Sequence, residues 1–260
     1  MQSIEKIVII GAGSLATNLA VALHNNGLQI LQIVNRTLSN ATILAEKVNA
    51  SYTNNFDKID LQADLYIIAV SDSIISEISE KLLLKNKLVV HTAGTIDMEI
   101  IKSISSNYGV FYPLQTFSKT EIIDLKNIPI CIEANSLDNE ALLIELGKKI
   151  SNNIQKTTSE QRKILHISAV FASNFTNYMY LVADKMLSEN QLSFDLLKPL
   201  IHRTAEKVQT QQPENALTGP ARRNDIVVMQ AHLQLLENHP EYQKIYKLIS
   251  DNINKHFHQS

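Results

Sequence analysis

A strand-like apolar run that breaks into a glycine-rich turn constrains the fold of this chain more than any other segment. Residues 7–10 read Ile-Val-Ile-Ile, residues 11–13 read Gly-Ala-Gly, and an amphipathic helical pattern begins at Ser14. In such a unit the first glycine permits the tight turn, and the second lets the backbone approach a diphosphate. The small residue Ala16 keeps the helix close to the strand. The segment therefore predicts a dinucleotide-binding turn with phosphates at a helix N-terminus.

The end of the next predicted strand indicates which dinucleotide is bound. Residues 30–34 form an apolar run, and Asn35, Arg36 and Thr37 follow it. An NAD site normally carries an acidic residue here for the ribose 2′-hydroxyl, and none is present. An arginine can pair with a 2′-phosphate, which a carboxylate would repel. The sequence thus favours NADP; the alternative is that Arg36 is a solvated residue at a helix start.

The expected cofactor contacts come from the ends of three neighbouring strands. A third segment, Ala69-Val70-Ser71, ends a strand and can cover the cofactor, although Ser71 is equally suited to cap the following helix. The complete set of expected cofactor contacts is Gly11, Ala12, Gly13, Ser14, Leu15, Ala16, Asn35, Arg36, Thr37, Ala69, Val70 and Ser71.

Strand and helix patterns alternate over the first part of the chain. Strand-like runs lie at residues 4–10, 30–34, 65–70, 88–91, 110–112, 128–132 and 153–157, and helical patterns lie at 14–26, 38–48, 73–84 and 138–150. This alternation predicts an α/β fold with a doubly wound, mostly parallel Rossmann sheet.

Strand signals end at residue 158, where the chain becomes entirely helical. Thr158 and Gln161 have the spacing of a capping box. Helices are expected at residues 159–188, 193–211, 220–237 and 240–256. We therefore expect a Rossmann-like NADP-binding domain over residues 1–158 and an all-α substrate and dimerisation domain over residues 159–260, the usual size range for domains.

Composition excludes several classes of protein. Of the 260 residues, 45% are hydrophobic and 19% are charged, which indicates a packed globular protein. The net charge of −2 and the lack of basic runs argue against nucleic-acid binding. Cys131, the one cysteine, lies in a strand-like run, so a packed thiol and a reducing compartment are expected, and no secretory segment precedes the first strand. A cytoplasmic protein is the prediction.

Residues 164–183 require a membrane check because they contain no Asp, Glu, Lys or Arg. Polar residues interrupt the segment, among them His166, Ser173 and Asn174, which favours a buried helix over a membrane span. We also expect no metal site, since His256 and His258 belong to a C-terminal end that is expected to fray.

Two segments at strand ends carry candidate chemistry. His91 ends a predicted strand and is followed by small residues, so it can donate a proton near neutral pH or serve as a hydrogen-bonded structural residue. Residues 111–118 interleave aromatic residues with Gln115, Thr116 and Ser118. This pattern is typical of a pocket-lining loop and equally of a packed loop between domains.

The long helix that begins near residue 159 carries the remaining catalytic candidates. His166, Ser173 and Asn177 follow one another on one helical side, with Asn174 at its flank, opposite a stripe that includes Phe171. A water-facing side normally carries Lys and Glu, so this side is expected to be buried or turned to a ligand. Asn174 and Asn177 can hold a substrate carbonyl or a carboxamide, or they can join two helices by hydrogen bonds.

A candidate anion site lies at residues 217–225. Pro220 is expected in the first turn of a helix, where exposed N–H groups, Thr218 and Arg222 can bind a substrate carboxylate. The alternative is that Arg222 pairs with Asp225 on the helix surface.

Taken together, these segments resemble a known family over nearly the whole chain. The matching motifs are Gly-Ala-Gly at 11–13, Tyr-Pro-Leu-Gln-Thr-Phe at 112–117, Ala-Val-Phe-Ala-Ser-Asn-Phe-Thr-Asn at 169–177 and Thr-Gly-Pro at 218–220. They are similar to uncharacterised NADP oxidoreductases that pair a Rossmann-like domain with a helical C-terminal domain of unknown function. The layout also resembles pyrroline-5-carboxylate reductase, ketopantoate reductase and the 6-phosphogluconate dehydrogenase superfamily.

This resemblance implies a cleft between the domains and a homodimer formed through the helical domain. It does not carry over a substrate. The catalytic lysine of the hydroxyacid dehydrogenase branch has no counterpart on the polar side of the long helix, since Lys163 lies near its start and Lys185 near its end. The terminal helix motif of the proline reductases is also missing.

The sequence therefore predicts an NADP-dependent oxidoreductase that transfers hydride between NADPH and a small carbonyl or imine bound between the domains. The substrate can be anionic, with Gln115, Thr218 and Arg222 as contacts. The candidate catalytic residues are His91, His166, Asn174 and Asn177, with a water held by Asn174 as another proton source. The rival hypotheses are a sensor that binds NADP(H) without turnover and a structural dimer with a vestigial turn.

Overall fold

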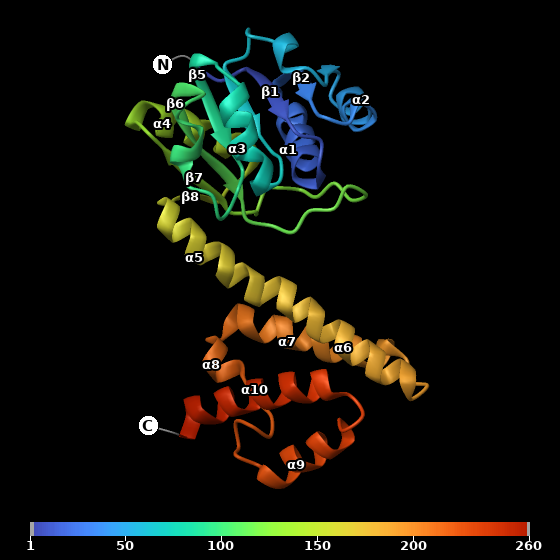
Figure 1. Cartoon of the computed structure of the whole chain (residues 1–260). Coiled ribbons are helices and arrows are strands. Elements are labelled where there is room, and N and C mark those ends of the chain that lie inside the picture. The colour runs from blue at the N-terminus through green and yellow to red at the C-terminus, as the bar shows by residue number, and fades with distance from the viewer. Residues whose placement is uncertain (1–2, 259–260) are drawn as a thin grey trace. The chain divides into compact units, whose positions relative to one another are not determined.

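The computed structural model describes residues 3–258 and divides the chain into two compact units, Met1–Val170 and Phe171–Ser260 (Figure 1). The first unit contains the whole sheet together with the helix that follows it. Each unit is described by itself.

An eight-stranded sheet in the order β3-β2-β1-β4-β5-β6-β7-β8 forms the centre of the first unit. Its strands are β1 (Lys6–Ile10), β2 (Gln29–Val34), β3 (Ser51–Thr53), β4 (Leu65–Ile68), β5 (Lys85–His91), β6 (Ser105–Pro113), β7 (Ile130–Ala134) and β8 (Ile154–Lys156). All neighbours are parallel except β6 and β7, which pair Tyr112 with Cys131 in antiparallel register. The predicted doubly wound, mostly parallel sheet is confirmed.

Helices cover both faces of the sheet because successive strand residues point to opposite faces. Ile7 and Ile9 of β1 belong to one buried core, with apolar residues of α1 (Ser14–Asn25), α2 (Leu38–Lys47) and α4 (Leu137–Ile150). Val8 and Ile10 belong to the other core, with α3 (Asp72–Lys81) and the 3₁₀ turn η2 (Met98–Ile101). The strand order reverses between β1 and β4, so the carboxyl ends of these two strands flank the position where such sheets bind ligands.

The helix α5 (Ser159–Ala169) completes the first unit. Its predicted capping box is present, because the Thr158 hydroxyl accepts from the Gln161 N–H at 3.3 Å and the Gln161 side chain accepts from the Thr158 N–H at 3.0 Å. The helix continues through the π-helical segment η3 (Val170–Phe175) into α6 (Thr176–Glu189). The long helix expected over residues 159–188 is thus observed, with a π-helical segment in its middle.

The second unit is helical. Beyond η3 and α6 it contains η4 (Phe194–Leu197), α7 (Lys198–Thr210), α8 (Pro213–Ala216), α9 (Ile226–Leu235) and α10 (Pro240–His258). Among the described residues of this unit only Ala221 and Leu236 are buried hydrophobics. A single chain therefore gives this unit almost no interior.

Sequence patterns missed one strand and misplaced the start of one helix. The short edge strand β3 was not expected, because its Ser-Tyr-Thr sequence carries no long apolar run. The helix expected from Pro220 begins instead at Ile226, after turns in which Gly219 and Asn224 have positive φ. The Asp225 side chain caps that helix by accepting from the Val228 N–H at 3.2 Å. No helix within residues 3–258 is long and apolar enough to cross a membrane.

Candidate functional site

The turn between β1 and α1 is shaped by its two glycines. Gly11 has φ +123°, its N–H donates to the Val34 carbonyl at 2.7 Å, and a Cβ there would collide with the Ala69 carbonyl oxygen. A Cβ on Gly13, by contrast, would meet no atom within 4 Å. Contacts within the protein therefore explain why position 11 must be glycine. Gly13, by contrast, borders open space.

That open space is part of a cavity of about 800 Å³ at the carboxyl ends of the strands, which we call the carboxyl-end cavity. Of the twelve expected cofactor contacts, all but Ala16 line it: Gly11, Ala12, Gly13, Ser14, Leu15, Asn35, Arg36, Thr37, Ala69, Val70 and Ser71. Ala16 is fully buried in the core between α1 and the sheet, as expected of a residue that permits close packing. The first turn of α1 holds no acidic residue and no side-chain cap, so its N–H groups are open to a ligand.

Charged side chains also line the carboxyl-end cavity. Three are cations, Arg36, Lys81 and Lys119, and two are acids, Asp72 and Glu77. None of the three cations forms a salt bridge in the part of the chain that the structure describes. Asp72 accepts a hydrogen bond from the Thr95 hydroxyl. The cavity thus offers free positive charge and an open helix N-terminus, which fits a phosphate-bearing dinucleotide.

A tyrosine and a histidine meet at the wall of the same cavity. The Tyr112 hydroxyl and His166 Nδ1 are hydrogen-bonded at 3.1 Å, although Tyr112 belongs to β6, His166 belongs to α5, and 54 residues separate them in the sequence. Gly94 lies against both, since a Cβ on it would collide with the His166 ring and lie 3.0 Å from Tyr112 Cζ. Burial raises the pKa of Tyr112 to about 12, so its hydroxyl stays protonated at neutral pH. The pair can therefore donate a proton to a molecule in the cavity.

His91, another candidate from the sequence, is fully buried and is not among the residues that line the carboxyl-end cavity. Its Nδ1 accepts from the Ala93 N–H at 3.2 Å. Burial, reinforced by the positive charge of Arg162, lowers the pKa of His91 to about 4. The His91 ring is thus neutral and enclosed, with Nδ1 hydrogen-bonded and Nε2 without a hydrogen-bond partner among the described residues.

A buried ion pair fixes the loop after β5, which contributes Thr92, Ala93 and Gly94 to the cavity. The Arg162 guanidinium has no exposed surface and donates to Glu133 Oε2 at 2.6 Å. It also donates to the Ala93 carbonyl at 3.1 Å and to the Ile96 carbonyl. Arg162 thus ties α5 to the loop on which Gly94 lies.

The remaining predicted site residues are distributed over both units. Gln115 lines the carboxyl-end cavity. Asn174 and Asn177 lie in the second unit and are exposed within one chain, whereas His166 of the same helical side lines the carboxyl-end cavity of the first unit. Arg222 in the second unit donates to three carbonyls, among them those of Glu214 and Leu217, and its guanidinium lies 4.8 Å from the centre of the Phe257 ring. The helix start expected at Pro220 is wrong, because the helix begins at Ile226, and Thr218 and Arg222 as contacts of a substrate carboxylate stay predictions.

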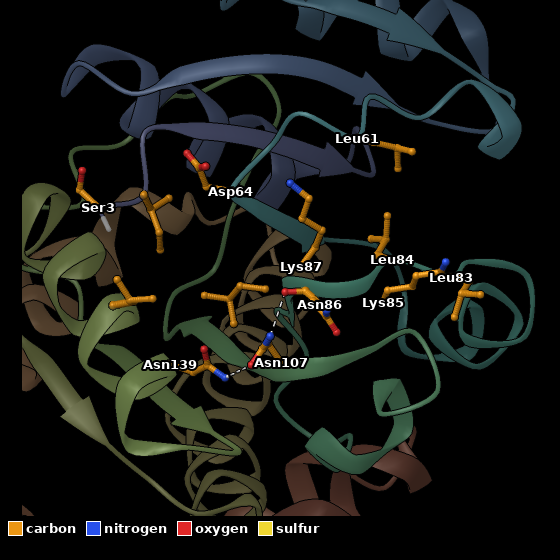
Figure 2. Close-up of a pocket in the computed structure, with 13 residues that line it drawn as sticks. Ser3, Leu61, Asp64, Leu83, Leu84, Lys85, Asn86, Lys87, Asn107 and Asn139 are labelled. Atoms are coloured by element: carbon orange, nitrogen blue, oxygen red, sulfur yellow. Dashed lines mark hydrogen bonds between the residues drawn. The ribbon is translucent and has the colours of Figure 1, made fainter. Parts of the chain in front are cut away.

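A second cavity, of about 680 Å³, lies at the opposite, amino ends of the strands (Figure 2). Three of its asparagines bond to one another: Asn139 donates to Asn107 Oδ1 at 3.1 Å, and Asn107 donates to the Asn86 carbonyl at 2.9 Å. The Lys87 ammonium donates to the Ala63 carbonyl at 2.9 Å. Because these groups already have partners and parallel sheets bind ligands at their other ends, we assign the candidate site to the carboxyl-end cavity. Within residues 3–258 no cluster of His, Cys, Asp and Glu could hold a metal ion.

Sequence reasoning missed Lys119, Arg162 and the roles of Tyr112 and Gly94. The Tyr-Pro-Leu-Gln-Thr-Phe motif drew attention to the right loop, but the partner of Tyr112 is 54 residues away. Arg162 has a weaker sequence signal: a charged residue in the first turn of an otherwise mixed helix is usually solvated.

The sheet, its glycine turn and the cavity define a Rossmann-like protein with a helical C-terminal region. Residues 2–104 match the family model Shikimate / quinate 5-dehydrogenase, and residues 128–253 match the Domain of unknown function (DUF2520). A crystal structure from Bacteroides fragilis, described as a "putative NADP oxidoreductase", has 44% sequence identity and a TM-score of 0.90, covering 96% of this chain and 98% of that one. This chain belongs to the same oxidoreductase family as that protein, and in it the Rossmann-like sheet is followed by the region that matches DUF2520.

More distant relatives share parts of this architecture. A pyrroline-5-carboxylate reductase from Streptococcus pyogenes covers 96% of this chain and 98% of its own, with a TM-score of 0.64 and 13% identity, which shows a shared fold. The glutamyl-tRNA reductase of Listeria innocua is 28% identical over 156 residues, which are 58% of this chain. That match spans 34% of the reductase, so the chain corresponds to about a third of the length of this relative.

Proposed function

We propose that this chain is an NADP-dependent oxidoreductase that transfers hydride between NADPH and a small carbonyl or imine. The observation that carries the proposal is one cavity that joins the glycine turn and its open helix N-terminus to the hydrogen-bonded pair Tyr112 and His166. When bound, the nicotinamide supplies the hydride. The chain's own residues then have to bind the phosphates and deliver a proton.

The preference for NADP rests on the residues that follow β2. Asn35, Arg36 and Thr37 all line the cavity, and none is acidic. Arg36 forms no salt bridge with any described residue, so its guanidinium is available to a 2′-phosphate. The name of the Bacteroides fragilis relative agrees with this preference.

The proton source that we propose is Tyr112 with His166. Reduction of a carbonyl or imine places a hydride on carbon and requires a proton on oxygen or nitrogen. The Tyr112 hydroxyl can donate that proton, and His166 Nδ1, 3.1 Å away, can resupply it. Catalytic roles for His91 and for the exposed Asn174 and Asn177 stay predictions, because no observation adds support for them. The pyrroline-5-carboxylate reductase fold is one reason to keep imines among the substrates, because 1-pyrroline is a cyclic imine.

We also propose that the chain works as a homodimer through its helical unit. Large apolar side chains there are exposed in the single chain, including Phe171 at 64%, Leu196 at 66% and Leu200 at 62%. A unit of this size needs a hydrophobic interior to fold, and among its described residues one chain buries only the hydrophobic side chains of Ala221 and Leu236. A second copy that covers these side chains would supply the interior.

The cytoplasm is the compartment that we propose for this protein. Cys131, the one cysteine, is buried and free, which suits a reducing environment.

The test is titration of the purified protein with NADPH and NADH by calorimetry, followed by NADPH oxidation assays with a library of carbonyls and imines. We expect tighter binding of NADPH than of NADH and turnover with at least one substrate. Arg36→Gln should lower NADPH affinity about tenfold and leave NADH affinity unchanged, while Lys47→Gln, on an exposed lysine at the end of α2, should change neither. Tight binding without oxidation of NADPH by any compound would instead identify a sensor, and absence of binding would refute both.

A further inference from the structure

The loop between β6 and β7 lies beside the start of α1. We call residues 114–124 of this loop the strap (Figure 1). Its contact with α1 runs through Asn18, which is fully buried and lies one turn after Ser14, the first residue of that helix. The strap is therefore next to the glycine turn in space, although about 100 residues separate the two in sequence.

Asn18 holds the strap at two points with a single side chain. Its amide nitrogen donates to the Ser118 carbonyl at 2.9 Å and to the Ser14 carbonyl at 3.0 Å. Its amide oxygen accepts from the Ile123 N–H at 2.9 Å. The strap also packs on the core through Phe117 and Ile123. Since Asn18 is satisfied by these bonds, its burial is explained by the strap and by no ligand.

Lys119 lies between the two points at which Asn18 holds the strap. A local turn, in which the Thr120 N–H donates to the Ser118 hydroxyl at 3.2 Å, surrounds it. The Lys119 side chain is exposed, forms no salt bridge within residues 3–258, and lines the carboxyl-end cavity together with Gly13 and Ser14. The cavity's acids, Asp72 and Glu77, belong to α3.

We propose that Lys119 is a cofactor-binding residue that the strap delivers to the diphosphate of the dinucleotide. The open N–H groups of α1 and a lysine ammonium in the same cavity provide complementary contacts for a dianionic diphosphate. Arg36, after β2, then binds the ribose 2′-phosphate, so Arg36 and Lys119 contact different phosphate groups of the cofactor. This assignment rests on the proposed binding of NADP(H), and it is independent of whether hydride transfer occurs.

The experiment compares Lys119→Gln with Arg36→Gln by calorimetric titration with NADP⁺ and NAD⁺, in the absence of any substrate. Lys119→Gln should weaken both cofactors by the same factor of about five to ten, because both carry the diphosphate. Arg36→Gln should weaken NADP⁺ alone. Lys126→Gln is the matched control, since Lys126 is an exposed lysine in the same connection that does not line the cavity. It should leave both affinities unchanged.

A second variant tests the role of the strap. In Asn18→Ala the strap loses its tether, so replacing Lys119 in that background should cost less than twofold in affinity. Circular dichroism and the melting temperature establish that each variant is folded. Should Asn18→Ala not fold, Lys119→Gln alone decides.

Three results would overturn the proposal. Affinities of Lys119→Gln equal to those of Lys126→Gln would show that Lys119 does not contact the cofactor. A loss restricted to NADP⁺ would assign Lys119 to the 2′-phosphate. Failure of the unaltered protein to bind either cofactor would refute this proposal and the proposed function together, whereas binding without turnover would refute only the reaction.

Discussion

Tyr112 and His166 form the part of the site on which the proposed chemistry depends most directly. Gly94 contributes by having no side chain, because a Cβ at this position would occupy the space of the His166 ring. At the scale of single residues the site thus depends on the Tyr112 hydroxyl, the His166 imidazole and the space that Gly94 leaves open by having no Cβ. Their functions can be separated by substitution.

Removing either member of the pair should slow turnover and spare cofactor binding. We expect Tyr112→Phe and His166→Gln each to lower kcat about a hundredfold or more, which is the usual contribution of a general acid. Affinity for NADP⁺ should change less than twofold. Because the pKa of Tyr112 is raised to about 12, unaltered protein should show no loss of kcat from its ionisation up to pH 10.

The matched control for this pair is Tyr108→Phe. Tyr108 is another tyrosine of β6, but its hydroxyl donates to Glu99 at 2.8 Å and does not line the cavity. It should retain normal turnover in steady-state assays. If Tyr112→Phe behaves like Tyr108→Phe, the pair is not the proton source.

His91 should make the protein less stable in mild acid. Its folded-state pKa of about 4 lies below the usual value of 6.5, so the fold favours the neutral ring. The contribution of the neutral His91 ring to the stability of the fold is fully present above pH 6.5. It is lost as the pH falls towards 4, because in this range the unfolded chain binds a proton on His91 that the folded chain does not bind. The shift corresponds to at most about 3 kcal/mol in the free energy of unfolding.

Urea denaturation at pH 7 and pH 4.5 measures this effect. His91→Gln should lose less stability between the two pH values than the unaltered protein, since it cannot titrate. His202→Gln, on an exposed histidine, should behave like the unaltered protein. A pH dependence of His91→Gln identical to that of the unaltered protein would contradict the assignment.

At the scale of elements, α5 is held to the sheet by charge inside the protein. Arg162 is fully buried, and the Glu133 side chain of β7 keeps only 13% of its surface exposed. Glu133 also accepts from the Ser159 N–H at 2.9 Å, so it binds the first turn of the helix as well as Arg162. This anchoring sets the position of His166, two turns further along α5.

Breaking this pair should cost more than removing it. Arg162→Met leaves the Glu133 carboxylate without its partner, and we expect a loss of about 3–5 kcal/mol in the free energy of unfolding. The double variant Arg162→Met with Glu133→Met should lose less than the single one. Urea denaturation of both variants gives the comparison, with Lys148→Met in the exposed pair with Glu145 as a control that should change stability by less than about 1 kcal/mol. A double variant less stable than Arg162→Met would argue against this account.

The elements also show which features of the fold can be predicted from the sequence. The periodicity of β1, α1 and β2 and the capping box of α5 are local patterns, and the structure contains each of them. The helix start at Ile226 was missed because Gly219-Pro220 is a common helix entrance, whereas here turns with positive φ follow it. The edge strand β3 forms because Ser51 to Thr53 pair with β2. A sequence of three residues with mixed polarity does not predict such pairing.

At the scale of the whole molecule, the two compact units differ in how they are stabilised. The first contains two continuous cores on the faces of its sheet. Among its described residues the second buries only Ala221 and Leu236 as hydrophobic side chains, and it leaves many large apolar side chains exposed within one chain. This contrast is the physical basis for the proposed homodimer.

The dimer can be tested by placing charge on the exposed apolar side chains. We expect the unaltered protein to sediment as a dimer at micromolar concentration in analytical ultracentrifugation. Phe175→Asp combined with Leu200→Asp should produce monomers, because unpaired carboxylates are costly to bury. Leu137→Asp is the control: Leu137 is 82% exposed but lies on α4 of the first unit, and its replacement should leave the dimer intact. A monomeric unaltered protein would refute the dimer.

The glycine turn, the alternation of strands and helices and the absence of an acid after β2 can be recognised in the sequence, because each depends on residues close together in the chain. Which side chains share the cavity follows from the folding of distant segments onto one another. Tyr112 meets His166 across 54 residues, Arg162 meets Glu133 across 29, and Asn18 meets the strap across about 100. Such pairs have no periodic signature, since their contact is created by the order of the strands and not by spacing along the chain.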